Sequence, residues 1–105
     1  MTCKLRRWTG KLERNPSFDR FVNAISELSS ADEEHGSVSL EHENGWNIGY
    51  TINRNLYLEK VDSDDPADRY HQTNASPEYV QRLWAELAAG NIQEILKEPW
   101  LPGYP

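Results

Sequence analysis

The sequence predicts an α+β fold in which an antiparallel meander sheet of three to five strands is packed on one face by helices. Between residues 37 and 61, apolar and polar side chains alternate with the period of two that is typical of strands. Before and after this stretch, apolar residues recur at helical spacing. The chain has 105 residues, which is the size of one domain, so we predict a single domain over residues 1–105.

The strands are predicted from this alternation and from the glycines and prolines between the apolar runs. The clearest three form the meander, and one further strand lies before it and one after it. Their ranges are 2–9, ended by Gly10, then 37–42, 46–52 and 54–61, and finally 69–73.

The first turn of the meander is predicted by the side chains that it would bring together. A two-residue turn would place carboxylates on the apolar face of the sheet. A three-residue loop at 43–45 pairs Leu40 with Ile48 instead, which keeps that face apolar. Gly45 would then be the residue in the left-handed conformation.

The same reasoning predicts the second turn as a three-residue loop at 53–55. This loop pairs Ile52 with Leu56 and Tyr50 with Leu58. Asn55 would adopt the left-handed conformation.

The first helix is predicted to begin after Asn15, which can cap it, with Pro16 in the first helical position. Apolar residues then recur on one face of the helix, and we expect all of them in the core. They are Phe18, Phe21, Val22, Ile25 and Leu28.

The second helix has clear signals at both ends. Ser76 is a suitable N-cap and Pro77 follows it, while Gly90 is a helix stop. A short last helix would be capped by Asn91, with Glu94 at the spacing of a capping box, and would end before Pro99. Trp100 and Leu101 would attach the tail to the body. The second helix contributes Val80, Leu83, Trp84 and Leu87, and the shared core is predicted to contain Trp46, Ile48, Tyr50, Leu58, Phe21, Ile25, Leu83 and Leu87.

Charge is unevenly distributed along the chain, whose net charge is −6. Residues 1–20 hold six basic and two acidic side chains, a net charge of +4, whereas residues 21–105 hold five basic and fifteen acidic ones, a net charge of −10. An acidic body favours a basic partner and disfavours nucleic acid and acidic membranes. No stretch approaches the ~20 apolar residues of a membrane span, and no signal peptide is apparent. Because the chain has a single cysteine, we expect a cytoplasmic protein.

The sequence contains no motif that indicates catalysis, a metal or a cofactor. Cys3 has no second cysteine to pair with, and the three histidines, His35, His42 and His71, lack the spacing of metal ligands. The segment 62–67 begins like a calcium loop, but proline and alanine take its fifth and sixth positions. We therefore expect that the protein is not an enzyme.

One face of the predicted sheet has the composition of a recognition surface. Seven small, polar or acidic residues point away from the apolar face: Ser39, Glu41, Asn47, Gly49, Thr51, Tyr57 and Glu59. Together with the acidic loop at 62–68, they suggest a partner-binding surface in which carboxylates face a basic cleft and tyrosines act as anchors. Its predicted members are Glu41, Glu43, Tyr57, Glu59, Asp62, Asp64, Asp65, Asp68 and Tyr70. A plain solvated sheet face is the alternative, and Asp32–Glu34 is a second candidate patch.

The layout resembles that of the small immunity proteins of bacterial toxin–immunity pairs, nearest to those of contact-dependent growth inhibition. The resemblance lies in the early helix, the meander, Ser76-Pro77-Glu78 with Leu83-Trp84, and the tail at 99–103. These families share no catalytic signature. The resemblance implies a protein that binds and neutralises a cognate toxin domain, possibly a nuclease, by occluding its active site. The alternative is a small accessory or regulatory domain that binds another kind of protein.

Overall fold

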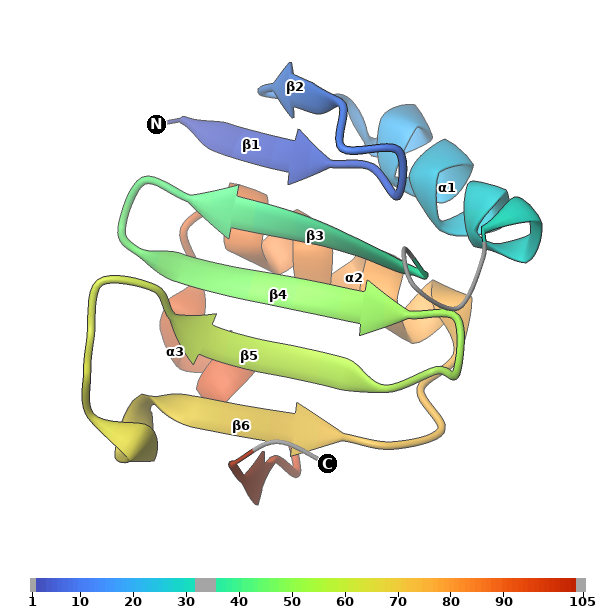
Figure 1. The fold of residues 1–105 in the computed structure, drawn as a ribbon. Coiled ribbons are helices and arrows are strands. Elements are labelled where there is room, and N and C mark those ends of the chain that lie inside the picture. Colours follow the sequence, from blue (N-terminus) through green and yellow to red (C-terminus); the bar gives the residue numbers. More distant parts are fainter. Residues whose placement is uncertain (1, 32–35, 104–105) are drawn as a thin grey trace.

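The computed structural model describes residues 2–31 and 36–103. Seven strands form one antiparallel sheet in the order β2-β1-β3-β4-β5-β6-β7 (Figure 1). This confirms the α+β class, although the sheet has more strands than the three to five predicted. In chain order the elements are β1 (Cys3–Arg6), β2 (Leu12–Arg14), α1 (Phe18–Ser26), the 3₁₀ turn η1 (Glu27–Ser30), β3 (Ser37–His42), β4 (Trp46–Thr51), β5 (Leu56–Lys60), the 3₁₀ turn η2 (Pro66–Asp68), β6 (Arg69–Gln72), α2 (Pro77–Ala88), α3 (Ile92–Leu96) and β7 (Leu101–Pro102).

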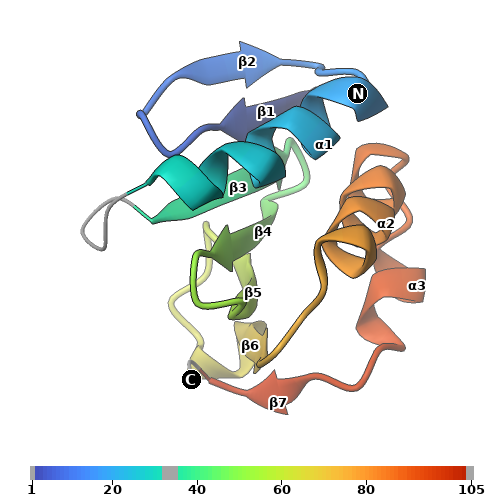
Figure 2. The same cartoon turned by 90° about the vertical axis from the view of Figure 1, so that its right-hand side faces the viewer.

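The helices lie together on one side of the sheet, and no described helix covers the other side (Figure 2). Helix α2 packs against β3 and β4 near the middle of the sheet, while α1 and α3 pack against α2. We call the uncovered side the open face. Its exposure matters because whatever the sheet displays there is accessible to a partner.

One hydrophobic core fills the space between the sheet and the helices. Trp84 of α2 is fully buried at its centre, where its indole N–H donates a hydrogen bond of 3.0 Å to the carbonyl of Ile48. The ring of Phe21 packs edge-on against Trp84 at 5.5 Å, which brings α1 into the same core. The predicted core is confirmed, with Trp46 half-buried at its margin.

The β3–β4 hairpin has the predicted register. Leu40 lies opposite Ile48 and Val38 lies opposite Tyr50. Gly45 has a φ of 92°, so it is the left-handed residue of the loop, as the alternation predicted.

The prediction for the β4–β5 turn is wrong by one residue. Tyr50 pairs with Leu56, and the left-handed residue is Arg54, with a φ of 63°, where Asn55 was expected. The amide of Arg54 donates to the carbonyl of Thr51, as Gly45 does to His42 in the first turn. Moving the loop by one residue shifts the pairing by two. Every side chain then keeps its face, and the alternation cannot detect the error.

Helix α1 begins two residues later than predicted. Ser17 occupies the N-cap position, while Asn15 has a φ of 47° and its side-chain oxygen accepts a hydrogen bond from the amide of Cys3. Asn15 therefore ties β2 back to β1 and does not cap the helix. Phe21, Ile25 and Leu28 of the predicted stripe are buried, but Phe18 and Val22 are exposed at 51% and 40%, contrary to the prediction.

The N-terminal strand is shorter than predicted, but burial still alternates beyond its end. Cys3, Leu5 and Arg7 are buried, while the residues between them are exposed. The Arg7 guanidinium is neutralised by Glu13, at 3.1 Å, and by Glu27. This pairing holds β2 and α1 against β1, since a buried cation needs hydrogen-bonded partners.

Both sheet edges are strands that the sequence analysis missed, β2 and β7. The tail at 101–102 pairs with β6, and the Trp100 indole donates to the carbonyl of Ile95 at 2.8 Å. The tail is thus attached as predicted, although Leu101 itself is exposed. The capping box is not formed, because the Asn91 side chain donates to Glu86 and makes no cap hydrogen bond.

The start of α2 is confirmed and is linked to the C-terminal segment. The Ser76 hydroxyl accepts from the amide of Tyr79 at 3.2 Å. The Tyr79 hydroxyl donates to Glu98 at 2.7 Å and accepts from Gln72 at 2.8 Å. Burial, opposed in part by the Gln72 hydrogen bond, raises the pKa of Tyr79 to about 12.

Replacing Leu83, which is 1% exposed, should test the core directly. Leu83→Ala is expected to lower the free energy of unfolding by about 2–5 kcal/mol, because it leaves a cavity beside Trp84. Leu101→Ala is the matched control, since Leu101 is 52% exposed and its truncation should cost less than about 0.5 kcal/mol. Urea denaturation measures both. Similar losses in the two variants would place Leu83 outside the core.

Tyr79 should make stability fall in alkaline solution. Its pKa is about 12 in the folded protein and near 10 when unfolded, so its contribution is complete below pH 10 and is lost as the pH rises towards 12. We expect the ultraviolet absorbance of tyrosinate to show a late-titrating group that is absent in Tyr79→Phe. The same variant should show a weaker loss of stability over that pH range. An unchanged titration curve would contradict this role.

Candidate functional site

The open face has the composition that the alternation predicted. Ser39 lies opposite Gly49, which lies opposite Tyr57, and Asn47 lies opposite Glu59. These residues share the face away from the core row of Leu40, Ile48 and Leu58. The structure extends the face to both edges of the sheet, where it adds Lys4, Arg6, Leu12, Arg14, Arg69, His71 and Leu101.

The acidic residues of the open face do not form a continuous acidic surface. Glu41 lies opposite Lys4 on one side and Asn47 on the other. Glu59 lies opposite Asn47 and Arg69. Each carboxylate therefore has a basic cross-strand neighbour, an arrangement that stabilises sheets and lowers the local net charge.

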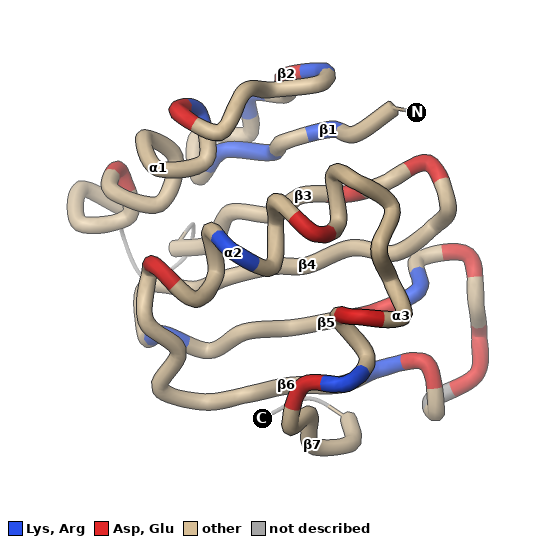
Figure 3. The backbone as a smooth tube through the Cα atoms, turned by 180° about the vertical axis from the view of Figure 1, so that it is seen from behind, with Lys and Arg blue, Asp and Glu red and all other residues tan. Residues whose placement is uncertain are grey.

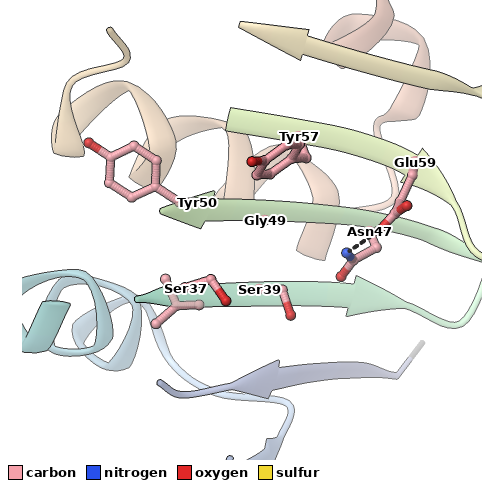
Figure 4. A pocket seen from close by; sticks show the side chains of 8 residues that line it. Ser37, Ser39, Asn47, Gly49, Tyr50, Tyr57 and Glu59 are labelled. Carbon is pink, nitrogen blue, oxygen red and sulfur yellow. Dashed lines mark hydrogen bonds between the residues drawn. The ribbon is translucent and has the colours of Figure 1, made fainter. Parts of the chain in front are cut away.

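An open hollow of about 450 Å³ lies in the middle of this face. Gly49 forms its floor, and the Tyr57 ring stands beside it (Figure 4). Glu59 and Asn47 lie together at one end, where the Asn47 amide donates to the carboxylate at 3.4 Å. The serines of β3 form the opposite wall, and the complete lining is Ser37, Val38, Ser39, Asn47, Gly49, Tyr50, Tyr57 and Glu59.

A second group of acidic residues gathers at one end of the sheet, where the β3–β4 hairpin and the β5–β6 loop lie side by side (Figure 3). The two segments are joined by a hydrogen bond of 2.8 Å from the amide of Val61 to the carbonyl of Gly45. Glu43, Asp62 and Asp64 are exposed there. We call this group, with Asp65, the acidic end.

The acidic end is held in shape by its own side chains. Asp68 accepts a hydrogen bond from the Ser63 hydroxyl at 2.6 Å, and Asp65 accepts from the amide of Ala67 at 2.9 Å. In the hairpin, His42 Nδ1 accepts from the amide of Asn44 at 3.0 Å. These hydrogen bonds constrain the loops, and a constrained loop loses less entropy on association.

The predicted partner-binding residues fall into separate places. Tyr57 and Glu59 line the hollow, Glu41 lies beside Lys4, and Glu43 joins the aspartates of the acidic end. Tyr70 requires a correction. It lies opposite Leu58 and is half-buried against the core, so it faces the helices. The alternative patch Asp32–Glu34 lies outside the described residues.

Two titratable side chains outside the hollow and the acidic end, those of Cys3 and His71, have structural surroundings. Burial raises the pKa of the Cys3 thiol, which disfavours the reactive thiolate. His71 Nδ1 donates to the carbonyl of Gly103 at 2.9 Å, which attaches the tail. Within residues 2–31 and 36–103, no three His, Cys, Asp or Glu side chains gather in a way that could hold a metal ion. No helix in the described part of the chain could cross a membrane.

Comparison with known proteins identifies no relative from which a function could be transferred. No protein family, curated protein or solved structure matches this chain.

Sequence reasoning missed the hollow although it placed most of its lining on the correct face. Asn47 and Gly49 were assigned to the open face but not to a site. The available signal was that the small residues Ser37, Ser39 and Gly49 are predicted on the same face as Tyr57. A hollow forms where cross-strand neighbours leave volume unfilled. Predicting one therefore requires the register of three strands.

Gly45 should be required for the shape of the acidic end. A Cβ at this position would lie 2.8 Å from Asp62 Oδ1, and the φ of 92° is unfavourable for other residues. Gly10→Ala is the matched control, because its φ is 91° but a Cβ would meet nothing within 4 Å. We expect Gly10→Ala to destabilise the protein by about 1 kcal/mol and Gly45→Ala by somewhat more, because the Asp62 carboxylate must also shift to make room for the new methyl group. Thermal denaturation measures the difference, and equal losses would mean that Asp62 moves aside freely.

Proposed function

We propose that this protein is an immunity protein, which binds a cognate toxin domain and neutralises it by stoichiometric occlusion. The observation that carries the proposal is the acidic end, where exposed carboxylates from two loops are brought together and held in one conformation. An ordered acidic surface is complementary to a basic cleft, such as the one with which a nuclease binds its substrate.

The mechanism needs no chemical step. Carboxylates of the acidic end would occupy the positions of substrate phosphates, or would cover a surface beside them. Long-range attraction would also accelerate the encounter above the ~10⁵–10⁶ M⁻¹s⁻¹ of uncharged surfaces. The inhibitor then acts once per toxin molecule, in the cytoplasm, where the cell's own nucleic acid must be protected.

The resemblance noted in the sequence supports the same function and also suggests a direct test. The gene should directly follow that of a large secreted toxin. Co-expression with the C-terminal domain of that toxin should restore growth, and the purified proteins should form a complex of equal stoichiometry. Continued toxicity with both proteins present would overturn the proposal and favour an accessory domain that binds another protein.

Reversing charges at the acidic end should slow association with the toxin domain. For Asp62→Lys combined with Asp64→Lys, we expect a rate constant about tenfold lower at low salt and a weaker dependence on salt. Asp19→Lys with Glu78→Lys is the control, because it changes net charge equally on α1 and α2. Stopped-flow measurements at two salt concentrations separate the pairs. If both double variants slow association equally, the effect depends on net charge and not on the position of the acidic end.

A further inference from the structure

We propose that the β2 edge of the sheet receives an extended acidic segment of a protein partner, which pairs with β2 as an additional strand. This contact lies apart from the acidic end and requires no toxin, so it goes beyond the proposed function. Three features of the edge support it: backbone groups that point out of the sheet, exposed cations beside them, and an exposed leucine.

The backbone of β2 directs hydrogen-bonding groups away from the sheet. The amide of Asn15 donates to the carbonyl of Cys3, so these two opposed residues form a bonded pair. Bonded and non-bonded pairs alternate along an antiparallel ladder, and Leu12 and Arg14 therefore direct their N–H and C=O groups away from β1. Because β2 is the last strand on its side of the sheet (Figure 1), an added strand could pair with these groups.

The opposite edge of the sheet is less suited to an added strand. The amide of Gly103 donates to the carbonyl of Arg69, so the same alternation makes Pro102 the outward-facing residue of β7. Proline has no N–H to donate, and β7 has only two residues. A proline closes one edge in this way, whereas β2 contains none.

The side chains beside the β2 edge favour an acidic occupant. Lys4, Arg6 and Arg14 are exposed on the open face, and none of the three forms an ion pair or a side-chain hydrogen bond with a residue that the structure describes. Two acidic side chains lie near them. Glu41 is opposite Lys4, and Glu43 lines a hollow with Lys4 and Arg14. The cations remain in excess, and a carboxylate opposite Arg14 would complete a cross-strand pair.

The same features disfavour two other occupants. A second copy of β2 would bring its own cations to the edge, where like charges repel. A nucleic acid would offer phosphates, which accept hydrogen bonds but leave the outward carbonyls of the strand without donors. A peptide backbone supplies both donors and acceptors at the spacing of the strand.

Leu12 determines the residue pattern expected of the added strand. It is 52% exposed and lies between Arg6 and the open edge, on the face that carries the cations. An antiparallel segment would place two residues, two positions apart, opposite Arg14 and Leu12. The first should be acidic and the second apolar. The residue between them would lie opposite Glu13, whose carboxylate already binds Arg7, so an uncharged residue fits there.

Nuclear magnetic resonance can test this contact with the blocked pentapeptide Thr-Asp-Thr-Val-Thr as the probe. Its counterpart with asparagine in place of aspartate is the comparison. We expect the acidic peptide to shift the amide signals of Leu12 and Arg14, to slow their exchange with solvent, and to bind about threefold more tightly than the asparagine peptide at low salt. Equal affinity for the two peptides, or no shift at about 10 mM peptide, would overturn the proposal.

Two further measurements address the other occupants. A single-stranded oligonucleotide that shifts the same signals at lower concentration than the acidic peptide would overturn the proposal in favour of a phosphate-binding surface. Shifts of these signals when the protein alone is concentrated would overturn it in favour of pairing between copies.

A proline variant isolates the backbone contribution. Leu12→Pro removes the outward N–H without removing a ladder hydrogen bond to β1, and proline is tolerated in an edge strand in that position. Leu12→Ala is the matched control, because it removes the leucine side chain and keeps the donor. We expect Leu12→Pro to weaken binding of the acidic peptide at least about threefold more than Leu12→Ala does. Equal binding by the two variants would contradict strand addition.

A charge variant tests the same contact if Leu12→Pro fails to fold, which circular dichroism would reveal. Arg14→Glu should abolish the preference for the aspartate peptide over the asparagine peptide, because the cross-strand partner of the carboxylate is lost. Leu101→Ala, at the opposite edge, should retain that preference. A preference unchanged in Arg14→Glu would overturn the proposal. Neither result bears on the acidic end, so the proposed function stands or fails separately.

Discussion

The contact between Trp84 and the central strand is the interaction on which the rest of the structure depends. Its indole N–H lies in a fully buried environment and donates a hydrogen bond to the carbonyl of Ile48. A buried donor without a partner is costly, so this bond sets the position of α2 over β4. Because Phe21 packs on the same ring, the position of α1 follows from it as well. One side chain thereby orients two helices relative to the sheet.

This arrangement leaves the other face of the sheet uncovered by the described helices. With the described helices on one side, the residues that point away from the core meet no covering element. They are small in the centre and charged towards both edges. Small residues make the hollow, and the surrounding face holds four basic side chains, Lys4, Arg6, Arg14 and Arg69, against the carboxylates of Glu41 and Glu59. The hollow thus lies in a mixed surface, and the strongly acidic region is confined to the loops at one end.

The distribution of charge along the sequence overstates the basic character of the N-terminal part. Arg7 contributes to the excess of basic residues in the first twenty positions, but its guanidinium is buried between Glu13 and Glu27. It serves to attach β2 and α1 to the sheet. The acidic loops are exposed, by contrast, so their carboxylates act on the surroundings. Charged side chains therefore stabilise the fold where they are buried and remain accessible where they are exposed.

The sequence by itself determined the central meander, helix α2 and the core that joins them. Alternation over β3 to β5 assigned side chains to the correct faces, and Ser76 with Pro77 located the start of α2, because these signals are local in the chain. Tertiary structure alone decided the remaining features. The edge strands β2 and β7 are too short to show a pattern, and the face that Tyr70 occupies depends on its pairing with Leu58. Arg7 is buried only because two glutamates reach it from other elements, and the hollow exists only where three paired strands bring small side chains together. These features depend on residues distant in sequence, whose proximity no local pattern records.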